Sequence, residues 1–255
     1  MTKQALTVAM VGAIGVAVTG SAQEPRANIH QAMPLSEALT PYAGPVVQEV
    51  RNGTLANTVL CGYQGWFMAR GDGFEPGFVH WGGVDRDPPR CTVDLWPDMS
   101  ELDPDERFPT NYRHADGSRA EVFSSTVRKT VVRHFEWMRQ YGIDGAFVQR
   151  FTSCIRNPDD WNTQRTSAVL SHCREGANRT GRLFAVMYDT DFDRRAVDAM
   201  VADWTRLKQA MDITGTPAYL RHRGGPVVSL WGYGFGHRKF EAEAAAELFA
   251  FLKRP

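Results

Sequence analysis

The sequence predicts an α/β protein in which parallel strands are covered by helices. Four short apolar segments alternate along the chain with four longer segments whose apolar residues recur at helical spacing. The apolar segments at 183–187 and 227–230 are nearly uninterrupted, as expected for parallel strands that are buried on both faces. About 230 residues follow a targeting segment, which is enough for one domain with a sizeable core.

The first half of the chain contains one strand, one long insertion and one helix. After a lead-in over 23–56, with a short helix at 35–39, the first strand is expected at 58–61. A polar and aromatic insertion follows over 62–122. Ser124 or Ser125 is expected to cap the next helix, and Gly142 to end it in a left-handed conformation. The apolar stripe of this helix is Val127, Val131, Phe135 and Met138.

The second half repeats the strand–helix alternation. Strands are expected at 145–151, 183–187 and 226–230. Asp159 is expected to open the helix after the first of these, Asp193 caps the helix after the second, and the last helix covers 240–252. The helix stripes comprise Trp161, Val169, Leu170 and Cys173, then Val197, Met200, Val201, Trp204, Leu207 and Met211, and finally Ala245, Leu248, Phe249 and Leu252.

The N-terminus has the features of a secretory signal peptide over 1–22. Lys3 precedes an apolar stretch rich in small residues, and Gly20-Ser21-Ala22 offers a cleavage site before Gln23. The mature protein is therefore expected to be secreted or periplasmic, with no membrane contact after cleavage. The 29 basic and 29 acidic residues balance and are interspersed, which argues against a nucleic-acid partner.

The cysteines show no spacing typical of a zinc site. An oxidising compartment permits disulfides, and four cysteines allow three pairings. Cys61–Cys91 is the favoured pair because both residues flank the same polar insertion, while Cys173 lies on a helical stripe and is expected to be a free, buried thiol. Cys154 is the fourth cysteine of the chain. No metal or other cofactor is expected.

Polar and aromatic residues follow the predicted strands, where both β/α barrels and doubly wound sheets place their sites. The residues concerned are Gln149, Arg150, Tyr188, Asp189 and Trp231. Asp189 is equally well interpreted as a catalytic carboxylate or as a loop-fixing one. Arg150 is interpreted either as orienting Asp189 or binding an acidic sugar, or as part of a salt bridge. The glycines at 232–236 lack the rest of a nucleotide-binding motif.

The insertion combines aromatic rings, carboxylates and a histidine, as carbohydrate sites do. A ring covers the C–H face of a sugar while polar groups bind its hydroxyls. Candidate substrate-binding residues are Tyr63, Trp66, Asp72, His80, Trp81, Asp94, Trp96 and Glu101. The alternative is a tryptophan-rich loop packed over a core. Residues 103–106, Asp-Pro-Asp-Glu, are interpreted as a solvated acidic turn.

Several ordered segments resemble a bacterial branch of proteins related to glycoside hydrolase families 99 and 71. These segments are CGYQGWF, HWG, TVDLWPDMSE, HFEWMRQYGIDGAFVQRF, MYDTDF and PVVSLWGYGF, and the resemblance covers 57–253. The families comprise endo-α-mannosidases, endo-α-mannanases and α-1,3-glucanases with (β/α)8 barrels. The resemblance implies that 57–255 is the N-terminal part of a barrel domain with about the first four strand–helix units.

The resemblance also implies where catalytic groups are missing. Family 99 enzymes carry paired glutamates in a Glu-Trp-His-Glu-like segment late in the barrel, and no such segment occurs here. The main catalytic carboxylates are therefore expected beyond Pro255, in a barrel whose C-terminal half is truncated. A half-barrel that completes itself by pairing with another chain is the alternative. Two functions follow: a secreted glycosidase, or a non-catalytic carbohydrate-binding protein.

Overall fold

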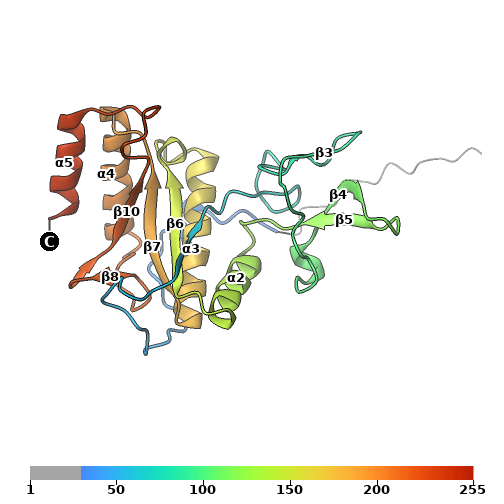
Figure 1. The fold of residues 1–255 in the computed structure, drawn as a ribbon, viewed down its shortest axis with the longest axis horizontal. Coiled ribbons are helices and arrows are strands. Elements are labelled where there is room, and N and C mark those ends of the chain that lie inside the picture. Colours follow the sequence, from blue (N-terminus) through green and yellow to red (C-terminus); the bar gives the residue numbers. More distant parts are fainter. Residues whose placement is uncertain (1–29, 255) are drawn as a thin grey trace, which may run out of the picture.

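The computed structural model describes residues 30–254, which form a parallel sheet with covering helices and a lobe beside it (Figure 1). The predicted signal peptide lies outside the described residues. The sheet has four strands in the order β1 (Leu60–Tyr63), β6 (Gly145–Phe151), β7 (Leu183–Asp189) and β10 (Val228–Trp231), all parallel. The α/β class and the parallel sheet are confirmed. Spatial order follows chain order among these strands, without the reversal that marks a doubly wound sheet.

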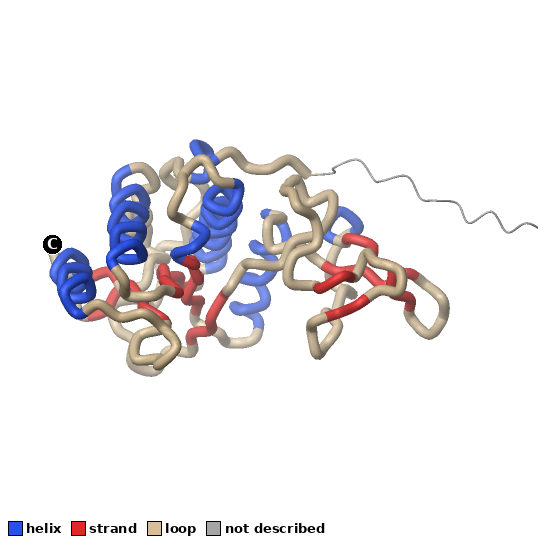
Figure 2. The backbone as a smooth tube through the Cα atoms, turned by 90° about the horizontal axis from the view of Figure 1, so that it is seen from above, coloured by secondary structure: helices blue, strands red, loops and turns tan. Residues whose placement is uncertain are grey.

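The helices follow the strands as expected from the sequence. They are α2 (Arg128–Gln140), α3 (Trp161–Thr180), α4 (Arg194–Gln209) and α5 (Ala242–Leu252), with the short α1 (Leu35–Ala38) against α3. Seen from above, the long helices lie along one side of the strands (Figure 2). Asp193 caps α4 by accepting the Ala196 N–H, as predicted. Gly142 has a φ of 74°, the left-handed conformation expected after α2.

Two helix starts differ from the sequence prediction. Asp160, one residue after the expected Asp159, caps α3 by accepting the Asn162 N–H. The expected caps of α2 are also wrong, because that helix begins after Val127 without a side-chain cap. The Ser124 hydroxyl instead donates to the Asp72 carboxylate at 2.6 Å. The hydroxyl of a serine before a helix can donate to a nearby acceptor in place of capping the helix. Here that acceptor is Asp72 of the insertion.

The main core lies between the sheet and the helices. Phe184 and Val186 of β7 pack with Leu170 of α3 and Phe135 of α2, and all four are fully buried. Burial of apolar side chains on this scale is the dominant favourable contribution to folding. The predicted stripes of α2, α3 and α4 supply this core, with Val131, Cys173, Val197, Met200 and Leu207 among its members.

A buried ion pair joins the sheet to two helices. Arg150 of β6 donates to both carboxylate oxygens of Asp203 on α4, at 2.7 and 2.9 Å, and neither side chain is exposed to solvent. Arg150 also donates to the Thr166 carbonyl of α3, and the Tyr188 hydroxyl of β7 donates to Asp203. Of the interpretations of Arg150, the salt bridge is formed, with Asp203 as its partner, and the pairing with Asp189 is not.

Residues 64–127 form the lobe, which has its own secondary structure and core. It contains β2 (Gly82–Gly83), β3 (Arg90–Cys91), the 3-10 helix η1 (Pro104–Glu106), and the β4 (Phe108–Arg113)–β5 (Arg119–Val122) hairpin. Trp81, Phe108, Val84 and Val122 are buried in its centre. The remaining short elements are η2 (Thr152–Cys154), β8 (Arg221–His222) and β9 (Gly225–Pro226).

All four cysteines are free, so the favoured Cys61–Cys91 disulfide is wrong. Cys61 lies in β1 of the sheet, whereas Cys91 lies in β3 of the lobe. The two cysteines are near the same insertion in the sequence, but they lie in different parts of the fold. Cys173 is free and buried, as predicted. Within residues 30–254, no helix is both long enough and apolar enough to cross a membrane.

We expect Asp203→Asn to destabilise the protein by about 3 kcal/mol, because it leaves the buried Arg150 charge without a counter-ion. Tyr188→Phe should cost about 1 kcal/mol, since it removes one hydrogen bond. Urea unfolding measures both values. Asp198→Asn is the matched control on α4, because the Asp198 side chain is 66% exposed. Equal stabilities of the Asp203 and Asp198 variants would contradict this role for the ion pair.

We also expect stability to fall between pH 6.5 and pH 4. Burial lowers the pKa of His172 from 6.5 to about 4, and that of His134 similarly. Between these values the unfolded chain binds protons that the folded protein does not, so the contribution is complete above pH 6.5 and declines on acidification. His172→Gln should flatten the slope of unfolding free energy against pH, while His114→Gln, at an exposed position, should leave it unchanged. Identical slopes would contradict the assignment.

Candidate functional site

Alternation along the strands separates the polar residues at their carboxyl ends into two sets. Arg150 pairs across the sheet with Tyr188, and both point into the helix layer. Gln149 pairs with Met187, and Phe151 with Asp189, on the opposite face. Successive side chains of a strand point to opposite faces, so the two sets cannot share one site.

The second set lines a cavity of about 400 Å³ at the carboxyl edge of the sheet. Trp66, Gln149, Asp189 and Trp231, all expected at a site from the sequence, meet in this cavity with Arg238. They come from the β1 loop, β6, β7, β10 and the segment before α5. Parallel strands bring their carboxyl ends to one edge, which explains how residues far apart in sequence converge.

Asp189 is held from two sides. The Gln149 amide donates to one carboxylate oxygen at 2.8 Å, and the Arg238 guanidinium donates to the other at 2.7 Å. Asp189 is 7% exposed. A carboxylate paired with a guanidinium acts as a fixed acceptor, and each oxygen retains a lone pair for a ligand hydroxyl. The arrangement suits the orientation of a polar ligand.

Arg238 is the main site residue that the sequence reasoning missed. Its guanidinium lies 5.4 Å from the centre of the Trp231 ring and 3.9 Å from the Asp191 carboxylate. It belongs to an irregular segment without periodicity, so no local pattern indicated it. Gln64, Phe151 and Met187 also line the cavity without having been expected there. Phe151 is the last residue of a strand, a position that favours a site residue.

Trp66 forms one wall of the cavity through ring stacking. It lies between His80, with ring centres 4.2 Å apart, and Phe151, with centres 5.6 Å apart. Gly65 turns the chain into this wall with a φ of 58°, which glycine adopts without strain. Burial and the nearby Arg165 charge lower the pKa of His80 below its usual value. His80 is thus kept neutral and supports the indole.

Three residues of the insertion are used in packing and do not line this cavity. Trp81 is 2% exposed, and its ring N–H donates to the Phe123 carbonyl. Asp72 is 2% exposed and accepts from the backbone N–H groups of Ala69 and Phe74. Burial raises the pKa of the Asp72 carboxyl. Trp96 donates to the Glu121 carbonyl. These contacts fix the lobe.

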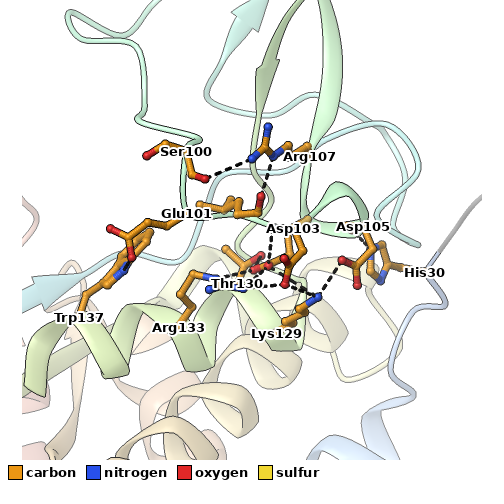
Figure 3. A network of polar contacts seen from close by, with 12 residues as sticks. His30, Ser100, Glu101, Asp103, Asp105, Arg107, Lys129, Thr130, Arg133 and Trp137 are labelled. Atoms are coloured by element: carbon orange, nitrogen blue, oxygen red, sulfur yellow. Dashed lines mark hydrogen bonds and ion pairs between the residues drawn. The ribbon is translucent and has the colours of Figure 1, made fainter. Parts of the chain in front are cut away.

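The other predicted residues are also outside the cavity. The Tyr63 hydroxyl is 2.9 Å from His134 Nδ1 on α2. Asp94 is exposed on the lobe. Glu101 accepts the Trp137 ring N–H at 2.9 Å beside a smaller hollow of about 230 Å³ (Figure 3). The side chains of Arg150 and Tyr188 point away from the cavity, toward Asp203 of α4. The structure thus brings four of the residues expected from the sequence into the cavity, with His80 stacked behind Trp66, and places the rest outside it.

Three acidic side chains at η1 form ion pairs with two cationic side chains of α2 (Figure 3). The oxygens of Asp103, Asp105 and Glu106 lie within 4.8 Å of one another, close enough to hold a metal ion. The Lys129 ammonium is 2.7 Å from Asp103, and the Arg133 guanidinium is 2.6 Å from Glu106. Residues 103–105 are exposed, as expected of a solvated turn, but Glu106 is fully buried. It anchors the lobe on α2.

No protein-family model matches the chain, and no curated protein matches it. Solved structures similar to it include that of the GH99 endo-alpha-mannosidase from Bacteroides thetaiotaomicron, in complex with Bis-Tris-propane, with 15% identity and a TM-score of 0.40. A second structure of that enzyme has 17% identity and a TM-score of 0.39. The alignments cover 71% and 69% of this chain. The chain spans less than half of those proteins, 43% and 45% of their lengths.

Proposed function

We propose that the protein binds a carbohydrate in the cavity at the carboxyl edge of the sheet. The observation that carries this proposal is Asp189, which Gln149 and Arg238 fix in a cavity that Trp66 and Trp231 also line. Aromatic rings and fixed polar groups line the same cavity. A sugar has a C–H face that packs on aromatic rings and hydroxyl groups that bind polar side chains. The protein would act outside the cytoplasm after removal of residues 1–22.

We further propose that 57–255 belongs to a (β/α)8-type barrel domain, of which the four strands are consecutive units. Sequential strand order supports this arrangement, and so does the placement of the long helices along one side of the sheet. In such a barrel, Gln149 and Asp189 face the interior and Arg150 faces the helices. The cavity then occupies the position where barrels hold their ligands.

Glycoside hydrolysis is the second candidate function, and the position of Asp189 at the end of a strand favours it. Hydrolysis generally requires two carboxyl groups that flank the bond. Among residues 30–254, Asp189 is the one carboxylate that lines this cavity, and both of its oxygens already accept hydrogen bonds. The geometry of the described residues therefore favours binding over turnover.

We expect Trp231→Ala to weaken oligosaccharide binding about fivefold, since an aromatic contact contributes roughly 1 kcal/mol. Trp66→Ala should have a smaller effect, because His80 and Phe151 stack on its ring and leave its edge for a ligand. Asp189→Asn should weaken binding more than Trp231→Ala, because the change removes the charge that orients Arg238. Titration calorimetry with tetrasaccharides from α-mannan, α-1,3-glucan and xylan measures these effects. Leu95→Ala is the control, because Leu95 is 85% exposed on the lobe and away from the cavity.

Thermal unfolding of each variant separates lost contacts from lost structure. Failure of the wild-type protein to bind any of the tetrasaccharides would contradict the proposed function. Loss of binding only in variants that are also unfolded would support the packed-loop alternative.

We expect no release of reducing sugar when the protein is incubated with α-mannan, α-1,3-glucan or xylan. A general acid and a general base must both lie within hydrogen-bonding reach of one substrate, and this cavity offers one carboxylate. Reducing-sugar detection over a day at neutral pH is the measurement. Turnover that disappears in Asp189→Asn would show that the protein is a glycosidase and that Asp189 is catalytic.

A further inference from the structure

Aromatic side chains continue outward from the cavity along the segment between β10 and α5. Trp231 and Phe235 are each 42% exposed, and His237 is also exposed. The Phe235 ring lies 5.0 Å from that of Trp231 and 5.7 Å from that of His237, on which it stacks at 11°. We call Trp231, Phe235 and His237 the aromatic platform. Large rings are usually buried, so three contiguous exposed ones indicate a binding surface.

The local sequence explains why these rings are presented outward. Glycine alternates with larger residues at 232, 234 and 236, and Gly232 and Gly234 have φ values of 109° and 83°. A Cβ at Gly232 would lie 2.5 Å from the Thr190 carbonyl oxygen, so only glycine fits there. The backbone conformation of this segment therefore depends on its glycines.

Tyr233 contacts a second group of rings on the other side of the segment, and its own side chain is 57% exposed. Its ring packs edge-on against Phe192, Phe240 and Phe249, with ring centres between 5.3 and 6.2 Å apart. Arg238 anchors the segment through Asp189 at 2.7 Å. The Arg238–Asp189 ion pair therefore holds the segment at the cavity, so the rings of the platform are positioned before a ligand arrives. Such preorganisation reduces the entropic cost of binding.

We infer that the aromatic platform is a second sugar subsite, so that the ligand is a glycan chain and not a single sugar. Trp231 belongs both to the cavity and to the platform, which makes the two surfaces continuous. A sugar that contacts Asp189 places its neighbour over Phe235 and His237. The inference rests on the proposed carbohydrate-binding function and adds the location of the subsite and the length of the ligand.

The test compares affinities for saccharides of one to four units from α-mannan, α-1,3-glucan and xylan. For the wild-type protein we expect at least a fivefold gain in affinity as the chain lengthens. Phe235→Ala should abolish this gain without changing the affinity for the monosaccharide, and Phe235→Trp should retain it. Tyr141→Ala is the matched control, because Tyr141 is an aromatic residue that is 69% exposed at the end of α2 and lies outside the platform.

The outcomes separate this inference from the proposed function. Length-independent binding that still requires Asp189 would overturn the subsite and leave the cavity as the whole site. A length-dependent gain that survives in Phe235→Ala would also overturn it. Absence of binding at every length would contradict both the proposed function and the subsite. Circular dichroism of Phe235→Ala and Phe235→Trp confirms that both variants are folded.

Discussion

The register between β6 and β7 is the constraint on which the site depends. Gln149 lies beside Met187, and Arg150 beside Tyr188, so a shift of one residue in either strand would exchange the two faces. Such a shift would direct the Arg150 charge away from Asp203 and bury Asp189 without Arg238. The contacts of Arg150 and Tyr188 with Asp203 and the apolar core beside them are satisfied in this register, which in turn orients the polar residues of the cavity.

The lobe stabilises the other wall of the cavity. Its core around Trp81 and its ion pairs with α2 hold the segment that carries Trp66. Asp72 and Ser124 connect the two ends of the insertion through one short hydrogen bond. Residues that resemble ligand-binding groups in sequence thus serve to position one indole ring. Their burial and satisfied hydrogen bonds are typical of structural polar residues.

The cavity and the aromatic platform together explain the exposed aromatic residues near the end of the described chain. Tyr233 packs against the buried Phe192, and Trp231, which also lines the cavity with Asp189, packs against Phe235. The polar residues of the cavity and the rings of the aromatic platform are suited to a long ligand with many hydroxyl groups. The proposed binding function accounts for Arg238 as well, since this residue contacts both Asp189 in the cavity and Trp231 of the aromatic platform.

The sequence by itself determined the α/β class, the strand–helix alternation and the edge of the sheet at which the polar and aromatic strand ends gather. Apolar periodicity and Asp193 as a helix cap are local features, so Gly145–Phe151 and Arg194–Gln209 followed from them. Only the tertiary structure decided which polar residues meet. The strand register places Arg150 beside Asp203. Packing of the lobe buries Trp81 and Asp72. A contact between distant parts of the chain places Arg238 beside Asp189. Such contacts depend on three-dimensional proximity, which residue spacing along a chain does not encode.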